Sequence, residues 1–309
     1  MPTVYPDYYP EFHCIAGACK HSCCIGWEID IDEDAARRFR AVTGDFCDRL
    51  QKNIAWEETP HFILGENERC PFLNSDGLCD MILTLGEDSL CNICRDHPRF
   101  RNELPDRVEI GLGLCCEEAA RLILGRKEPM TLLSDGPLYD DDDEILALRD
   151  DILSLLQDRE NTIPQRVAAM LRLCDAPMPH GDWGAWAELL LSLERLEEGW
   201  TALLEKLKAE PPADFTAFDA HMEGREAEYE QLLCYLIYRH FANACTWEDA
   251  AARASFAAFG YLLLHAMGAV LFAENGSFTF EDQCELARLF SAEIEYSDEN
   301  LDILLEQFL

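Results

Sequence analysis

Cysteine is the residue type that most constrains how this chain can fold. Eleven of its 15 cysteines lie at or before Cys116, and four of these fall within CIAGACKHSCCIGW, residues 14–27. Further groups follow in CPFLNSDGLC (70–79), in CNIC (91–94) and at positions 115–116. Thiols this dense, separated by turn-forming glycine and proline, determine the local fold through whatever they bond or bind.

Disulfide bonding and simple packing are two possible states of these thiols. The N-terminus MPTVYPDYYPEF lacks the basic start and apolar core of a secretory signal, so reduced thiols are expected. The vicinal Cys23 and Cys24 also cannot bond to each other without a strained peptide. Packing alone does not explain a CxxC motif beside vicinal pairs. It is expected instead for the cysteines on predicted helices, namely Cys47, Cys174, Cys234, Cys245 and Cys284.

Metal binding is the state that the pattern favours. Thiolates are soft ligands that select zinc or iron–sulfur clusters, and a CxxC loop lets two sulfurs converge. A small domain with little regular structure also needs an internal staple, which a bound metal supplies. Both zinc and iron–sulfur accept four cysteines, so sulfur number leaves the metal open. The set is too large for one tetrahedral zinc, which favours a cluster or two sites. The histidines of this region are expected to be hydrogen-bond partners rather than ligands: His13, His21, His61 and His97.

The sequence predicts a mainly α fold in two domains. Residues 1–130 form a small, irregular, cysteine-rich metal-binding domain, with one helix over 33–53 and a short strand over 107–114. Residues 131–309 form an acidic α-helical domain, whose first helix begins at the acidic run DDDDE (140–144). Its helices are predicted over 143–158, 163–173, 183–208, 215–244, 246–273, 279–292 and 298–308.

Charge and hydropathy exclude several classes of partner. The net charge of −35 disfavours nucleic acid, because acidic surfaces repel phosphate, and makes a basic protein surface the better partner. Residues 131–309 carry −25 of this charge; it either steers such a partner or forms an ordinary solvated surface. The stretch FAAFGYLLLHAMGAVLFA (256–273) has no Asp, Glu, Lys or Arg. Its length, its His265 and its flanks favour a buried core helix, so no membrane association is expected.

Residues 5–126 carry a resemblance in four blocks, of which the second (Cys70 and Cys79) and the third (Cys91 and Cys94) lie on one continuous string. YPDYYPEFHCIAGACKHSCCIGWEIDID, CPFLNSDGLCDMILTLGEDSLCNICRDHPR and GLGLCCEEAARLIL resemble, in the same order, the flagellin lysine N-methylase family. The cysteine-rich part of that family is related to a broader zinc- or iron-chelating domain family. Two departures stand in the last block, where Cys115 replaces a usual serine and Glu117 a usual proline. His97 likewise replaces a usual tyrosine.

The resemblance implies a cytoplasmic bacterial enzyme that transfers methyl groups from S-adenosylmethionine to lysine side chains of flagellin. It also implies a cysteine-bound iron–sulfur cluster of the [4Fe-4S] type, with zinc as the alternative metal. The implied metal ligands are Cys14, Cys19, Cys23, Cys24, Cys70, Cys79, Cys91, Cys94 and Cys116. A different class of function is a non-catalytic zinc- or iron-binding module with a helical partner-binding domain.

The residues for catalysis and donor binding are less defined. Neither a glycine-rich nucleotide-binding turn nor the CxxxCxxC motif of radical clusters is present, since Gly26 stands where the third cysteine would be. Aromatic rings attract a cationic methyl donor, which makes Trp27 a candidate for cofactor binding. Tyr8, Tyr9 and His97 are the candidate catalytic residues, although aromatic side chains beside turns also pack there for structural reasons.

Overall fold

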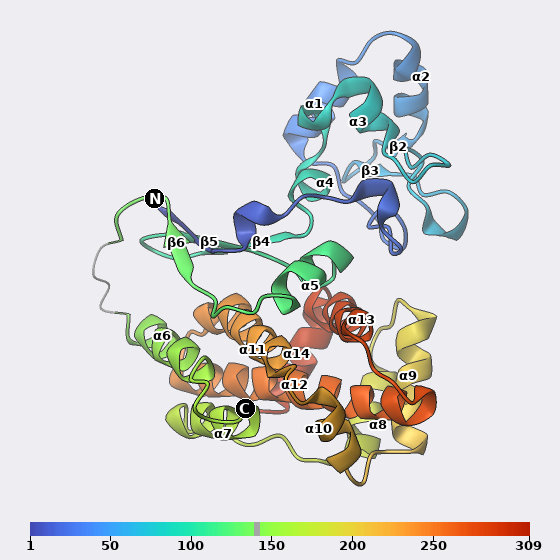
Figure 1. Cartoon of the computed structure of the whole chain (residues 1–309). Helices are drawn as coiled ribbons and strands as arrows, with labels where there is room; N and C mark the ends of the chain where they lie inside the picture. The colour runs from blue at the N-terminus through green and yellow to red at the C-terminus, as the bar shows by residue number, and fades with distance from the viewer. Residues whose placement is uncertain (139–142) are drawn as a thin grey trace. The chain divides into compact units, whose positions relative to one another are not determined.

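The computed structural model describes residues 1–138 and 143–309 and divides the chain into two compact units (Figure 1). His13–Arg99 form one, here called the cysteine-rich unit. Met1–Phe12 and Phe100–Leu309 form the other, here called the helical unit. The expected boundary at residue 130 therefore falls inside the helical unit, and the first twelve residues belong to it as well.

A four-stranded sheet explains why the boundary differs. Its order is β4 (Arg99–Glu103), β5 (Val108–Leu112), β1 (Thr3–Pro6), β6 (Leu132–Ser134). β1 runs parallel to β5, with Thr3 opposite Val108, and antiparallel to β6, with Val4 opposite Ser134. These pairings tie the N-terminus to residues beyond 100, so the cysteine-rich unit is an insertion between β1 and β4. The predicted strand over 107–114 is confirmed as β5.

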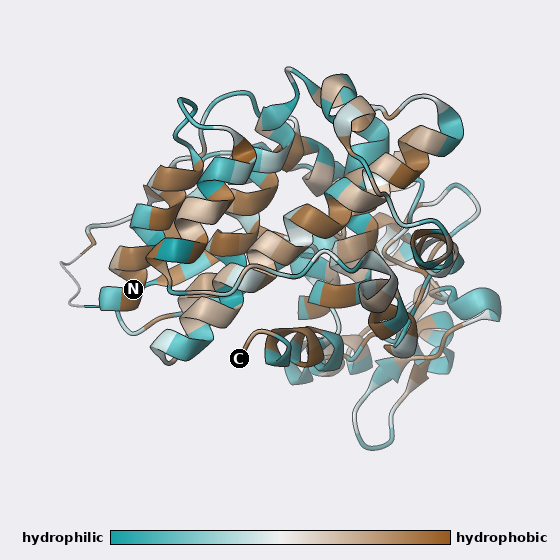
Figure 2. Ribbon diagram, turned by 90° about the horizontal axis from the view of Figure 1, so that it is seen from below, coloured by the Kyte–Doolittle hydropathy of each residue, from teal (hydrophilic) through white to brown (hydrophobic). Residues whose placement is uncertain are grey.

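Among the described residues the helical unit contains ten α-helices. They are α5 (Glu117–Leu124), α6 (Glu144–Leu156), α7 (Ile163–Leu173), α8 (Trp183–Ser192), α9 (Glu198–Ala209), α10 (Thr216–Met222), α11 (Glu226–His240), α12 (Trp247–Asn275), α13 (Phe280–Phe290) and α14 (Asp298–Glu306). The prediction of a mainly α protein is confirmed. Figure 2 shows hydrophilic and hydrophobic turns on most helices, as amphipathic packing requires.

Two long predicted helices are each broken in the structure. The span 183–208 becomes α8 and α9, and 215–244 becomes α10 and α11. The second break follows from Gly224, whose φ of +82° lies in the left-handed region that glycine adopts most readily. In the acidic run predicted to start a helix, residues 140–142 lie outside the described residues, but Asp143 caps α6 by accepting from the amides of Ile145 and Leu146.

Helix α12 is the core of the helical unit. It contacts α7, α9, α10, α11, α13 and α14, and Phe256, Leu263 and Met267 are fully buried. A Cβ on Gly260 would lie 2.8 Å from Leu236 Cδ1, so glycine permits the close approach of α11. The helix is long and apolar enough to cross a membrane, but most of it is buried in this unit. The prediction of a buried core helix is confirmed.

The cysteine-rich unit has its own small core. Its helices are α1 (Glu33–Arg40), α2 (Asp45–Lys52), α3 (Asp80–Leu85) and α4 (Asn92–Asp96), with the paired strands β2 (Ile54–Ala55) and β3 (His61–Phe62). The helix predicted over 33–53 is interrupted at Gly44, whose φ is +91°. Within the core the Phe62 ring stacks with that of Phe39 and meets that of Phe72 edge-on. The core is separate from that of the helical unit.

Candidate functional site

Five cysteines of the cysteine-rich unit share its core: Cys24, Cys70, Cys79, Cys91 and Cys94. The backbone brings the first two together, since the amide of Cys70 donates to the carbonyl of Cys24 at 2.8 Å. A bridge between Leu73 and Cys79 closes the 70–79 loop. Cysteines separated by up to 70 positions in the sequence therefore place their thiols in one core.

Backbone amides lie beside two of these sulfurs. The amides of Phe72 and Leu73 lower the pKa of the Cys70 thiol, and those of Met81 and Ile82 lower that of Cys79, although burial outweighs both effects. Cys79 and Cys91 each precede the first residue of a helix, α3 and α4, where amides lack intrahelical partners. Amide hydrogen bonds stabilise thiolates and tune cysteine-bound clusters, so this is the environment that a metal ligand needs.

The electrostatics of the set also fit a cation. Burial and the neighbouring Cys24 and Cys79 raise the pKa of Cys70 to about 11. A hydrogen bond with Cys91, together with burial, raises the pKa of Cys94. A hydrogen bond with Cys23 outweighs burial and lowers the pKa of Cys24 to about 7. Several thiolates in one apolar region repel one another, and a bound metal ion removes that repulsion.

The remaining implied ligands lie outside the core that these five cysteines share. Cys14 is exposed, and its Sγ accepts from the amide of Ala16 at 3.4 Å. Cys19 Sγ donates to the carbonyl of His21 at 3.2 Å. The side chain of Cys23 forms a hydrogen bond with the Cys24 thiol. Cys116 belongs to the helical unit, where it precedes α5. Their roles as ligands stay a prediction.

Two candidate residues from the sequence meet beside the sulfur set. The rings of Trp27 and His97 lie 5.8 Å apart, and Trp27 Nε1 donates to the carbonyl of Cys23 at 2.8 Å. Burial and the nearby charge of Arg99 lower the pKa of His97 to about 4. His97 is therefore neutral at neutral pH and a weak base there.

The two candidate tyrosines lie in the helical unit instead. Tyr8 is fully buried, and burial raises its pKa above the ordinary range for tyrosine. The guanidinium of Arg126 lies 6.0 Å from the centre of its ring. Tyr9 packs against Tyr5, with ring centres 5.8 Å apart. Tyr8 is a core residue in this structure, which argues for a structural role.

Sequence reasoning missed a buried polar centre in the helical unit. Glu295 ends a π-helix over Ser291–Glu295, and its side chain is inaccessible to solvent. Its carboxylate accepts from the Tyr235 hydroxyl at 3.0 Å, and its Oε1 lies 3.5 Å from Nε of Arg239. Arg239 also donates to the Tyr235 hydroxyl at 2.7 Å. π-helical turns occur often at functional sites, which makes this centre a second candidate site.

The segment 113–116 packs against this centre. The amide of Leu114 donates to the Tyr235 hydroxyl at 3.2 Å. Cys115 hydrogen-bonds Tyr296, and burial raises the pKa of the Cys115 thiol to about 12. A Cβ on Gly113 would lie 2.2 Å from the Tyr296 hydroxyl, so only glycine fits there. The guanidinium of Arg239 lies 4.7 Å from the centre of the Tyr296 ring.

Burial on its own would raise the pKa of Glu295. The charge of Arg239 and the hydrogen bond with His240 reverse that effect and lower the pKa to about 2. Burial lowers the pKa of His240, against the opposing influence of Glu295. The centre therefore holds an ionised carboxylate, a guanidinium and a neutral imidazole at neutral pH. No local signal in the sequence indicates it, because its partners lie between positions 113 and 296.

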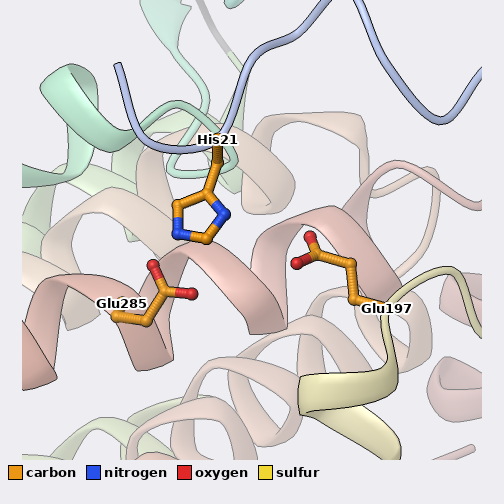
Figure 3. Close-up of side chains that lie close together, drawn as sticks. All are labelled: His21, Glu197 and Glu285. Carbon is orange, nitrogen blue, oxygen red and sulfur yellow. The ribbon is translucent and has the colours of Figure 1, made fainter. Parts of the chain in front are cut away.

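A further ion-pair group lies at the start of α9 and on α13, and Figure 3 labels two of its members, Glu197 and Glu285. Arg288 donates to Glu197 at 2.7 Å and to Glu285 at 2.7 Å. Glu293 accepts from the amides of Leu196 and Glu197, at 2.9 and 2.7 Å. His21, which Figure 3 also labels, belongs to the cysteine-rich unit. Arg288 on α13 and Glu293 in the π-helix that follows it therefore both hold the start of α9.

One more acid–base pair lies on α10 and α12. Nε2 of His265 lies 2.8 Å from Oδ1 of Asp219. Burial lowers the pKa of His265, although Asp219 opposes that shift. Aromatic rings lie around the imidazole at 4.9–6.0 Å between centres: Phe215, Phe218, Tyr229 and Tyr261. The pair is partly open to solvent on the side of Asp219.

Comparison with known proteins finds a match within the helical unit. Residues 183–309 match the family model of the FliB lysine N-methylase C-terminal domain. Lysine-N-methylases of Salmonella typhimurium and Salmonella choleraesuis are each 26% identical over 221 residues, which cover 66% of this chain and 53% of each relative. The flagellar biosynthetic protein FliU of Salmonella muenchen is 29% identical over 136 residues, which cover 41% of this chain and 79% of FliU.

The chain spans about half the length of the lysine N-methylases that it matches. No solved structure matches it. The family match covers the π-helix with Glu295 and the Asp219–His265 pair, but it begins beyond the cysteine-rich unit.

Proposed function

Since this chain belongs to the flagellin lysine N-methylase family, we propose that it transfers methyl groups from S-adenosylmethionine to lysine side chains of flagellin in the bacterial cytoplasm. The match of residues 183–309 to the FliB C-terminal domain carries this proposal. The flagellar name of the relative FliU supports a flagellar protein as the substrate.

We further propose that the cysteine-rich unit holds an iron–sulfur cluster. The residues that would hold it are drawn from Cys24, Cys70, Cys79, Cys91 and Cys94, because they share one core and backbone amides lie beside the sulfurs of Cys70, Cys79 and Cys91. When bound, such a cluster supplies redox-active iron whose potential depends on those hydrogen bonds and on burial. Zinc is the alternative metal for the same thiolates.

The site must allow the ammonium group of the substrate lysine to lose a proton. An ammonium group has no lone pair, so the amine must be neutral before it accepts a methyl group. A pKa of about 4 makes His97 too weak a base to hold that proton at neutral pH. In this proposal the amine therefore loses its proton through desolvation, and the aromatic face of Trp27 attracts the cationic donor.

Metal analysis separates the two candidate metals. Protein purified without oxygen is expected to be brown, with iron and acid-labile sulfide in equal amounts. Colourless protein with stoichiometric zinc would overturn the cluster. Cys91→Ser should abolish the colour, because Cys91 is 1% exposed and its thiol is hydrogen-bonded to that of Cys94. Cys47→Ser is the matched control, since Cys47 lies on α2 outside the sulfur set, and it should keep the colour.

Activity is tested separately with purified flagellin and S-adenosylmethionine. Mass spectrometry should find added methyl groups on flagellin lysines with the wild-type chain and with Cys47→Ser. A metal-loaded protein that never turns over would instead support a non-catalytic metal-binding module with a helical partner-binding domain.

A further inference from the structure

A short antiparallel pairing in the cysteine-rich unit places three metal-binding side chains together. The amide of Ile31 donates to the carbonyl of Pro60 at 2.7 Å, and that of Phe62 donates to the carbonyl of Ile29 at 3.1 Å. These two bonds flank Asp30 and His61, which face each other directly. They form a non-hydrogen-bonded pair, the type in which opposing side chains are closest, with Cα atoms about 4.5 Å apart.

Strand periodicity adds a third side chain to the same face. Glu28 lies two residues before Asp30, so the two carboxylates project to the same side. Ile29, Ile31 and Phe62 point to the opposite side and are at most 3% exposed. Their burial anchors the pairing in the core of the unit, so the face that carries Glu28, Asp30 and His61 is held by the fold.

The ligand atoms of Glu28, Asp30 and His61 all lie within 4.8 Å of one another. Metal ligands of these types bind at about 2.0–2.2 Å, so two of them on one ion are separated by at most about 4.4 Å. Nε2 of His61 already lies 3.7 Å from Oε2 of Glu28. Small side-chain rotations are therefore enough to bring all three onto one ion.

The second ring nitrogen of His61, Nδ1, forms a hydrogen bond with the backbone. Nδ1 lies 3.0 Å from the carbonyl oxygen of Thr59, which can only accept a hydrogen bond. Nδ1 therefore donates to that carbonyl, which leaves Nε2 as the ring nitrogen that faces Glu28 and is available to a metal ion. This outer hydrogen bond, from ring nitrogen to backbone carbonyl, is the arrangement that orients metal-binding histidines.

We propose that Glu28, Asp30 and His61 form a divalent-cation site separate from the cysteine set. One imidazole and two carboxylates are ligand types that suit divalent ions such as Mn²⁺ and Fe²⁺, which do not need a thiolate. The bound ion joins the segment before α1 to β3, and so closes the loop between residues 30 and 61 without using a sulfur.

The test uses Mn²⁺ as the probe and the chain with its cysteine-bound metal in place. Mn²⁺ is titrated into the protein at physiological ionic strength, and the concentration of free Mn²⁺ is measured by electron paramagnetic resonance. One Mn²⁺ per chain should bind. Glu28→Gln with Asp30→Asn, or His61→Gln alone, should weaken binding by at least tenfold, about the lower limit seen when even an outer-sphere partner is removed.

The matched control neutralises two exposed carboxylates of the same unit, Glu33→Gln with Asp34→Asn, and should leave Mn²⁺ affinity unchanged. Equal weakening in the control and the triad variant would show only counterion attraction and overturn the site. The absence of stoichiometric binding to the wild type would mean an ordinary ion pair and would also overturn it. Retention of the metal colour or zinc content in each variant shows that the unit remains folded, independently of methyl transfer.

Discussion

Nε2 of His240 lies 2.6 Å from Oε1 of Glu295, and both side chains are buried within the helical unit. Arg239, with Nε 3.5 Å from the same oxygen, supplies the positive charge that offsets the carboxylate. Both partners come from the end of α11, whereas Glu295 comes from the π-helix that follows α13. The contact between His240 and Glu295 therefore joins α11 to the π-helix. Both elements lie within residues 183–309, which match the FliB C-terminal domain.

Glu295→Gln should destabilise the helical unit strongly. The substitution leaves the guanidinium of Arg239 buried without an opposite charge, and losing one partner of a buried ion pair costs about 3–5 kcal/mol. The free energy of unfolding from urea titration measures this. Glu299→Gln is the matched control, because Glu299 is exposed in the first turn of α14, and it should change stability by less than about 0.5 kcal/mol. Equal losses would contradict the assigned role of Glu295.

Acid should unfold the helical unit in two successive pH ranges. His240 has a lowered pKa in the folded chain, so the unfolded chain takes up its proton first, and stability falls as pH drops below about 6.5. Glu295 has a pKa of about 2 when folded, so its contribution is present above about 4.5 and is lost as pH falls from there toward 2. Urea unfolding at pH values between 7 and 3 measures both ranges. In Glu295→Gln the loss below pH 4.5 should be smaller; an unchanged slope there would contradict the assignment.

Asp32 should control how firmly the cysteine-rich unit holds its metal. Its Oδ1 accepts from the amide of Ala35 at 2.9 Å and caps α1, while its Oδ2 accepts from the amide of Asn92 at 2.8 Å. Asn92 follows Cys91 directly, so Asp32→Ala removes a helix cap and loosens the CxxC segment. The loss of the cap costs about 0.5–2 kcal/mol. Metal release to a chelator should be faster than in Asp45→Ala, whose acidic side chain starts α2 away from the sulfurs. Equal release rates would argue against this coupling.

Local sequence signals predicted some elements closely, because the chemistry that defines those elements is local. The predicted helix over 163–173 coincides with α7, where Thr162 and Gln165 form a capping box within four residues. The break between α8 and α9 was not predictable in this way. It is stabilised by Glu293, whose carboxylate binds the amides of Leu196 and Glu197 from almost a hundred positions away.

The same distinction holds for the candidate sites. Cysteine spacing indicated a ligand set spread along the chain, and the structure brings Cys24, Cys70, Cys79, Cys91 and Cys94 into one core. Spacing could not indicate that Cys116 lies in the other unit, because that depends on the pairing of β1 with β5. The Glu295 centre had no sequence signal, since each of its polar residues resembles an ordinary surface residue until the helices pack.

Gly260→Ala should destabilise the helical unit although alanine favours helices. The new Cβ would lie 2.8 Å from Leu236 Cδ1 and 3.4 Å from Phe290 Cζ, and overpacking of this kind costs about 1–3 kcal/mol. The gain in helix propensity is only about 1 kcal/mol. Gly199→Ala is the control, because nothing lies within 4 Å of its Cβ position on α9, and it should be neutral or stabilising. Thermal unfolding compares the two, and a higher melting temperature for Gly260→Ala would contradict the packing of α11 on α12.

The acidic helical region should accelerate the encounter with flagellin if flagellin is the substrate. Residues 131–309 carry a net charge of −25, and attraction to a lysine-bearing surface raises association rates by about 10- to 1,000-fold at low ionic strength. Salt screens this attraction, because the Debye length falls from about 30 Å at 0.01 M to about 8 Å at 0.15 M. Stopped-flow association with flagellin should therefore slow steeply between these concentrations, while dissociation changes little. An association rate that is independent of salt would mean that the acidic surface is only a solvated one, and it would leave the methyl-transfer proposal untouched.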